Sequence, residues 1–313
     1  MWINRFFLSI CIVLVIDIQL FAQLDSIYQS HATEDGSAFS VTLDAVVISD
    51  FKKGINIPFF IQKMQEDESF YRAFKNTRFA SYNFKNKVQF FDKKNQMVAA
   101  YEGDCQQNYE QDCRSMKILK DTFWGENFSR DGSYKYYTMK LFDRLFFTNG
   151  KICGKQPENS NSTSDQNSHV SELKKLIFKP GSKADVPFIG SKMAIFSKEM
   201  SKYYDFRLMS SSIKGHDCYT FIVSVKPEIE MENKDATVVK YLETYFDKTN
   251  LQVFGRKYNL TYKGFWFDFD VSMDIELTKI KDKYYPQKIN YDGYWDVPMK
   301  KPEKAKFEIQ FDY

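Results

Sequence analysis

The chain has 313 residues, of which 44 are Lys or Arg and 41 are Asp or Glu, so its formal net charge is +3. This near-balance supplies no dense positive field for a phosphate backbone, which argues against a nucleic-acid-binding protein. Charged residues make up 27% of the chain, a proportion typical of globular proteins. The aromatic content is high, at 17%, whereas only three histidines are present, which leaves few His-based metal sites.

The first 22 residues have the pattern of a secretory signal peptide. Arg5 supplies the positive n-region, residues 6–16 form the apolar h-region, and Ala22 is a small residue at the cleavage position. The apolar run is shorter than the roughly 20 residues that a membrane-spanning helix needs, which favours a cleaved signal peptide over the alternative, a signal anchor. We therefore expect an exported protein of the periplasm or cell envelope, peripheral to the membrane at most, with a loose segment over residues 23–50.

Export to an oxidising compartment makes the cysteines candidates for disulfides. Four remain after the signal peptide, and they allow three pairings that the sequence does not distinguish. One arrangement joins Cys105 to Cys113 as a local staple and leaves Cys153 to pair with Cys218 across the two halves of the chain.

Helical signals are concentrated in residues 58–80, where we predict one or two helices. Pro58 suits a first helical turn, and a one-sided stripe follows at helical spacing if the helix tolerates Asp67. A second, short helix is predicted over residues 193–203. The stripe consists of Phe60, Met64, Tyr71, Phe74 and Arg78.

The rest of the chain predicts strands joined by short turns, which implies antiparallel neighbours. An edge strand is expected over residues 41–49 and a hairpin around residues 92–96. The polar segment at about 155–172 is expected to be a mobile loop that interrupts a single β-rich domain, residues 51–313, and the sequence does not distinguish this insertion from a linker between two domains. The other predicted strands are residues 134–139, 141–148, 203–209, 218–225, 238–247, 251–262, 265–278, 284–294 and 305–311.

The segment 265–277 alternates strictly between apolar and polar residues, and 305–311 repeats this pattern. Such alternation predicts strands with one apolar face, and the length of the first segment suits a strongly curved sheet or half-barrel. If helices only cover that face, it forms a pocket for an apolar ligand; if they fill it, it is core. The hypothetical pocket lining is Phe265, Phe267, Phe269, Val271, Met273, Ile275, Leu277, Phe307, Ile309 and Phe311.

No catalytic, cofactor-binding or metal-binding motif is found in the sequence. Residues 216–218 place imidazole, carboxylate and thiol side by side, but neighbouring strand residues point to opposite faces, so they make a poor catalytic dyad. The long strand carries a row of acidic residues. This row could bind calcium, or it could simply be a face exposed to solvent. This row is Asp268, Asp270, Asp274 and Glu276.

The segment 241–262, the long strand after it and residues 283–289 resemble the half-barrel of lipoprotein-sorting (LolA-like) proteins. The whole chain is also similar to uncharacterised exported proteins of Bacteroidota-type bacteria. The segments that carry this likeness are 70–76, 136–138, 145–148 and 293–297. The first resemblance implies a non-enzymatic envelope protein that binds a lipid, acyl chain or lipoprotein. The alternative is a structural module with a packed core that contacts another envelope protein.

Overall fold

In this computed structural model the described residues are 40–43, 56–154, 178–183, 189–264, 268–296 and 301–313. Residues 41–313 form one compact unit, and the description that follows concerns this unit. The predicted signal peptide, the segment 23–39 and the polar segment 155–172 lie outside the described residues.

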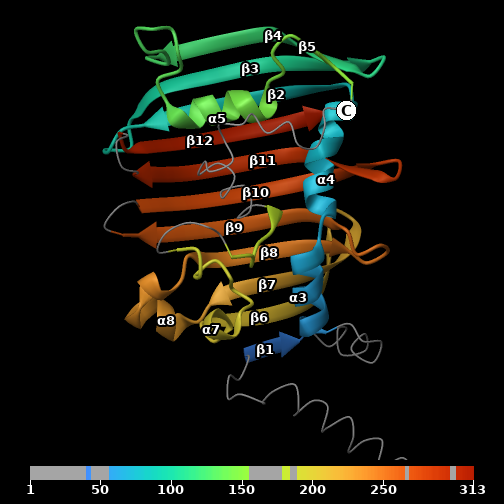
Figure 1. The fold of residues 1–313 in the computed structure, drawn as a ribbon, viewed down its shortest axis with the longest axis vertical. Coiled ribbons are helices and arrows are strands. Elements are labelled where there is room, and N and C mark those ends of the chain that lie inside the picture. Colours follow the sequence, from blue (N-terminus) through green and yellow to red (C-terminus); the bar gives the residue numbers. More distant parts are fainter. Residues whose placement is uncertain (1–39, 44–55, 155–177, 184–188, 265–267, 297–300) are drawn as a thin grey trace, which may run out of the picture. The chain divides into compact units, whose positions relative to one another are not determined.

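A single curved, open sheet of 12 strands dominates the unit (Figure 1). Its spatial order is β1-β6-β7-β8-β9-β10-β11-β12-β2-β3-β4-β5, and the pairs from β6 to β5 are antiparallel. The C-terminal strand therefore lies beside β2. This confirms the predicted mainly β fold, an antiparallel meander with a few helices. The strands are β1 (Ser40–Leu43), β2 (Tyr82–Phe91), β3 (Met97–Glu110), β4 (Cys113–Gly125), β5 (Lys151–Cys153), β6 (Tyr204–Ile213), β7 (His216–Val225), β8 (Val239–Asp247), β9 (Val253–Lys263), β10 (Asp268–Ile280), β11 (Lys283–Asp296) and β12 (Glu303–Asp312).

Two consecutive helices, α3 (Ile57–Glu66) and α4 (Ser69–Asn76), cross the strands of the sheet (Figure 1). Pro58 lies in the first turn of α3, as expected, and Asn56 caps the helix by accepting a hydrogen bond from the Phe59 N–H (2.9 Å). The helices predicted over residues 58–80 are therefore confirmed. The single stripe depended on a helix that continues through Asp67, and it is not formed because the chain leaves the helical conformation at that residue.

The break at Asp67 gives each helix its own buried positions. The buried side chains are Ile57, Phe60 and Met64 on α3 and Phe70 and Ala73 on α4, whereas Tyr71 is exposed. The other helices of the described residues are α5 (Tyr137–Phe146), α7 (Lys198–Ser201) and α8 (Pro227–Glu232), with 3₁₀ turns at Thr77–Phe79 and Lys234–Ala236.

The predicted strands at residues 134–139 and 141–148 are wrong, because most of this segment forms α5. Its aromatic residues favour strands by propensity. Thr138, Met139 and Phe142, however, lie on one face of the helix and are buried. The Glu303 carboxylate accepts hydrogen bonds from the backbone N–H groups of Tyr137 and Thr138 (2.7 and 2.8 Å), which satisfies the first turn.

Other boundaries differ from the predictions in length. The hairpin around residues 92–96 is present, but β3 continues to Glu110, and β4 follows it where the sequence predicted no strand. Only residues 198–201 of the predicted helix 193–203 are α-helical. The strand predicted over residues 41–49 is described only as far as Leu43.

Cys113 and Cys153 form a disulfide, and Cys105 and Cys218 are free and buried. The arrangement with Cys105 joined to Cys113 is therefore wrong. Cys113 begins β4 and lies directly opposite Cys153 of β5, whereas Cys105 belongs to the apolar core. Burial raises the pKa of the Cys105 thiol to about 11, so this thiol stays protonated and unreactive at neutral pH.

Candidate functional site

The predicted pocket-lining residues that the structure describes point to the face of the sheet that carries the helices. Their neighbours Asp270 and Ser272 are exposed on the opposite face, which we call the wet face. The alternation read from the sequence therefore separates the two faces of β10 and β12 correctly. Buried in the core are Phe269, Val271, Ile275, Leu277, Ile309 and Phe311; Met273 and Phe307 are half-buried; Phe265 and Phe267 lie outside the described residues.

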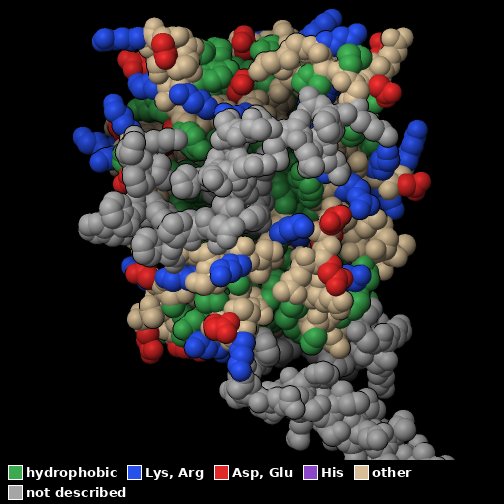
Figure 2. Space-filling model, in the orientation of Figure 1, with side chains coloured by type: hydrophobic (Ala, Val, Ile, Leu, Met, Phe, Trp, Pro, Cys, Tyr) green, Lys and Arg blue, Asp and Glu red, His purple; other side chains and the backbone are tan. Residues whose placement is uncertain are grey.

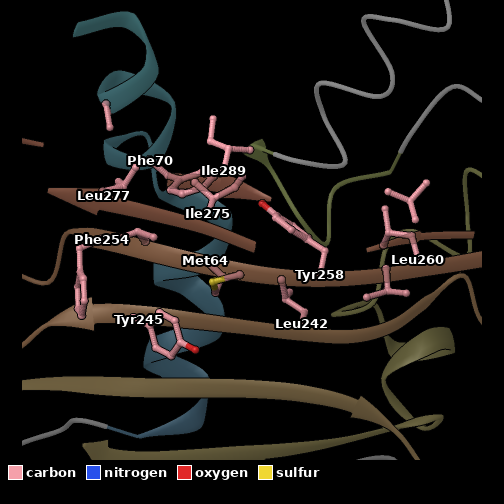
Figure 3. Packing of buried hydrophobic residues seen from close by; sticks show 14 of the residues in the cluster. Met64, Phe70, Leu242, Tyr245, Phe254, Tyr258, Leu260, Ile275, Leu277 and Ile289 are labelled. Atoms are coloured by element: carbon pink, nitrogen blue, oxygen red, sulfur yellow. The ribbon is translucent and has the colours of Figure 1, made fainter. Parts of the chain in front are cut away.

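Beneath α3 and α4 the apolar face is closed by side chains. Phe60 packs with the rings of Tyr219, Phe221 and Phe246, at centroid distances of 5.4, 6.0 and 5.0 Å. Figure 3 shows Met64 of α3 over the middle strands, with Tyr258 and Leu242 near it and Phe70 near Ile275 and Ile289. This part of the face is packed core.

A fully buried arginine lies in this closed region. The Arg256 guanidinium sits over the Phe70 ring, 4.5 Å from its centroid, and 3.9 Å from the Asp67 carboxylate. Its Nε donates a hydrogen bond to Thr244 Oγ1 (3.1 Å) and its Nη1 to Tyr258 OH (3.4 Å). Burial raises the pKa of Tyr258 and the nearby Arg256 charge opposes that shift.

Arg256 thus ties the junction of α3 and α4 to the middle of the sheet. Asp67 also accepts hydrogen bonds from the Ser69 and Phe70 N–H groups (3.0 and 3.2 Å), so one carboxylate both begins α4 and pairs with β9. Ser69 Oγ accepts from Val253 N (3.0 Å). Sequence reasoning missed this site, since Arg256 has no local pattern that separates it from a surface residue.

A second part of the same face is less completely covered. Five rings from β9 to β12 follow one another across the strands, and we call them the aromatic row: Tyr262, Phe269, Trp295, Tyr291 and Phe307. The centroid distances are 6.1 Å from Tyr262 to Phe269, 5.2 Å from Phe269 to Trp295 and 4.6 Å from Tyr291 to Phe307. Trp295 Nε1 donates to Tyr291 OH (2.6 Å), which completes the row. Only Phe269 is fully buried; the other four remain half-buried.

Gly293 leaves the space that one ring of the aromatic row occupies beside the sheet. A Cβ atom on Gly293 would lie 2.0 Å from Tyr291 Oη, so the tyrosine occupies the space that this glycine leaves open. The row ends at Phe307 on β12, where it meets α5. The rings of Phe142 and Phe146 lie 5.5 and 6.2 Å from the Phe307 ring, measured between centroids. Burial raises the pKa of Tyr291, and the Trp295 hydrogen bond opposes this shift.

The wet face carries a groove of about 530 Å³ over β8 to β12 and β2. Three lysines and three carboxylates line it, so its charge is balanced, and Lys306 pairs with Asp292 at 2.6 Å. Burial raises the pKa of Asp274, partly offset by Lys257. The charged residues of the lining are Lys87, Lys257, Lys306, Asp274, Asp292 and Glu308. Its other residues are Gln89, Tyr241, Ser272, Asn290, Tyr258, Met273, Tyr291 and Phe307, so the groove also touches Met273 and two members of the aromatic row.

The described residues contain no group of three or more His, Cys, Asp or Glu side chains close enough to hold a metal ion. The acidic row of β10 is spread along the wet face: Thr261 donates to Asp270 (3.1 Å), and Lys214 pairs with Glu276. At the start of β7, His216 is exposed while Cys218 is buried, so they do not form a joint site. Among the described helices, none has the length and apolar character needed to cross a membrane.

No protein-family model matches the chain, and no curated protein matches its sequence. The solved structures that are similar to it include the following three. A LolA superfamily protein from Nitrosomonas europaea is 7% identical, covers 79% of this chain and 94% of its own, and has a TM-score of 0.22. A DUF1329 family protein from Desulfovibrio piger is 10% identical, with coverages of 79% and 92% and a TM-score of 0.22.

The third structure is a putative outer membrane lipoprotein-sorting protein domain from Vibrio parahaemolyticus. It is 8% identical, covers 76% of this chain and 90% of its own, and has a TM-score of 0.23. At these scores the likeness carries no argument about the site.

Proposed function

We propose that this protein is a non-enzymatic protein of the cell envelope that binds an apolar ligand, namely a lipid, an acyl chain or a lipoprotein, on the helix-bearing face of its sheet. The ligand contacts the aromatic row and Met273, beside the region that α3 and α4 close. No cofactor takes part. The proposed location follows from the signal-peptide pattern of residues 1–22.

The observation that carries the proposal is the aromatic row. Tyr291, Trp295 and Phe307 keep part of their surface accessible while they contact one another, and half-buried Met273 lies between Tyr258 and Tyr291 in the register. The free energy of binding becomes more favourable by about 25 cal/mol for each Å² of this apolar surface that a ligand covers. Flexible Met and flat rings also adapt to chains of varied shape.

The second candidate is an interaction module whose apolar face is filled by its own helices. The burial of Phe269, Ile275 and Ile309 favours it, because these predicted lining residues already belong to the core. The two candidates differ in the role of the half-buried residues. In a ligand-binding protein these side chains contact a small ligand, whereas in an interaction module no small ligand is bound there.

The first experiment is mass spectrometry of the protein purified from its native envelope, intact under gentle conditions and again after solvent extraction. We expect a stoichiometric lipid or acylated peptide that is lost on extraction. A protein that is bare, and that stays bare after incubation with a lipid extract, contradicts the proposal and favours the interaction module.

A pair of variants on neighbouring residues assigns the ligand to a face. Met273→Asp places a charge among the half-buried rings, and Ser272→Asp places the same charge one residue away on the wet face. We expect Met273→Asp to remove the bound lipid and Ser272→Asp to retain it, with both variants folded by circular dichroism. Loss of the ligand in Ser272→Asp alone would instead assign it to the groove on the wet face.

A further inference from the structure

The groove on the wet face runs across the strands between two rows of side chains. Its volume of about 530 Å³ is within the range of ligand-binding clefts. On β10 the lining residues Ser272 and Asp274 flank Met273, and the same spacing recurs on β11 and β12. Residues two apart on a strand point to the same face, so the flanking side chains form two walls. Neighbouring strands lie about 4.8 Å apart, so a groove that follows the strands from β9 to β2 is about 19 Å long.

One wall consists of residues in direct register across these strands, namely Lys257, Asp274, Asn290, Glu308 and Lys87. Ion pairs neutralise most charged groups of both walls, which leaves the groove without a strong field of either sign. Such a groove disfavours a polyanion or a polycation as its ligand. The ion pairs are Lys87 with Glu102 (2.6 Å), Lys306 with Asp292 (2.6 Å), Lys288 with Glu308 (2.9 Å) and Lys257 with Glu243 (4.0 Å).

Two polar side chains in the middle of this wall are left over. Asp274 and Asn290 lie directly opposite each other on β10 and β11, and both are half-buried. Within the described part of the chain, neither side chain forms a hydrogen bond or an ion pair. Burial raises the pKa of the Asp274 carboxyl, and the Lys257 charge opposes that shift. A carboxylate in this state is unfavourable in the free protein, whereas a ligand that donates hydrogen bonds to it removes that cost.

We propose that the groove on the wet face binds a neutral saccharide chain, which lies across the strands and hydrogen-bonds with Asp274 and Asn290 through its hydroxyl groups. An ionised carboxylate only accepts hydrogen bonds, whereas an amide both donates and accepts, so this pair fits two neighbouring sugar hydroxyls. The opposite wall adds the Ser272 hydroxyl and the Gln89 amide along the same path.

Other classes of ligand fit this groove less well. A peptide strand gains its affinity from free backbone groups at a sheet edge, and the strands from β9 to β2 have paired neighbours on both sides. A nucleic-acid backbone would meet three carboxylates in the lining. The apolar ligand proposed above contacts side chains that point to the other face. Saccharide binding therefore does not depend on that ligand.

The test is isothermal titration calorimetry of the full chain with neutral oligosaccharides, namely maltohexaose, cellohexaose and chitohexaose. We expect the wild-type protein to bind at least one of them. Asp274→Ala and Asn290→Ala each remove hydrogen bonds to the sugar, and each is expected to weaken binding by about tenfold. Neither variant should melt at a lower temperature than the wild type, because neither side chain loses an internal partner. Weaker binding without a loss of stability separates a ligand contact from a structural role.

Asp270→Ala is the matched control. Asp270 is exposed on the same face of β10 and does not line the groove, so this variant should bind like the wild type. The proposal would be overturned if none of the oligosaccharides binds, or if both groove variants bind as tightly as the wild type. Binding of a tetralysine peptide while all the oligosaccharides are rejected would overturn it as well.

Vesicles distinguish two sources of such a ligand, a free glycan and the sugar headgroup of a lipid. The probes are phosphatidylcholine vesicles with and without digalactosyl diacylglycerol, and sedimentation measures the bound protein. Binding that requires both the glycolipid and Asp274 supports the proposal and assigns the groove to a headgroup. Binding of the soluble oligosaccharides alone supports it and assigns the groove to a free glycan.

Discussion

The middle of this sheet and its β4 end are stabilised by different means. Over the middle strands the helices α3 and α4 bury Phe60, Met64 and Phe70 completely and pair Asp67 with Arg256. At the β4 end the strand is largely exposed, and a disulfide between β4 and β5 fastens the edge. An apolar sequence pattern therefore becomes core only where another element covers it. Figure 2 shows hydrophobic side chains still visible at the β4 end of this face.

The largest effect is expected at the buried ion pair. Arg256→Met leaves the nearly inaccessible Asp67 carboxylate without its counter-ion, and we expect the free energy of unfolding to fall by about 3–5 kcal/mol. Urea unfolding followed by circular dichroism measures the change. The double variant Arg256→Met/Asp67→Asn removes the uncompensated charge and should recover part of this loss; equal losses in both variants would contradict the assigned pairing.

A matched pair of phenylalanines compares the closed and the open parts of the face. Phe60→Ala removes a fully buried ring and is expected to cost about 3–5 kcal/mol. Phe307→Ala, in the half-buried aromatic row, should cost clearly less because part of its surface is already accessible. Thermal and urea unfolding of both variants test this difference, and equal costs would show that the row is core.

At the β4 end the expected loss comes from the disulfide. The bond closes a loop with a sequence separation of 40, for which the chain-entropy model gives about 4 kcal/mol and measured cases typically give about 2–4 kcal/mol. Replacing both Cys113 and Cys153 by Ser should lower the free energy of unfolding by that range. A reducing agent should destabilise the wild type and leave the double variant unchanged, which is the internal control.

The smallest effect on stability, but a clear one on ligand binding, is expected at Gly293. Alanine there displaces the Tyr291 hydroxyl and breaks its hydrogen bond with Trp295. Because the far end of a tyrosine side chain can move away, the free energy of unfolding should fall by only about 1 kcal/mol. Binding of a fluorescent fatty acid by Gly293→Ala, compared with the wild type, should weaken; unchanged affinity would exclude Tyr291 from the ligand site.

The sequence by itself determined which strands alternate between apolar and polar residues, and which face of the sheet each of their side chains points to. Residues 269–277 and 305–311 have a period of two that only a half-buried strand satisfies, and the structure gives them that conformation. The start of α3 was also readable, because Pro58 lies within its first helical turn. These features depend on interactions between near neighbours in the chain.

Only the tertiary structure decided the features that join distant segments. The segment 137–146 has the composition of a strand and is helical because it packs on β12 and receives its cap from Glu303. The pairing of Cys113 with Cys153 follows from the register of β4 and β5. Arg256 is buried because α3 and α4 end and begin above it. No local pattern carries such information, since each of these contacts depends on a partner brought close only by folding.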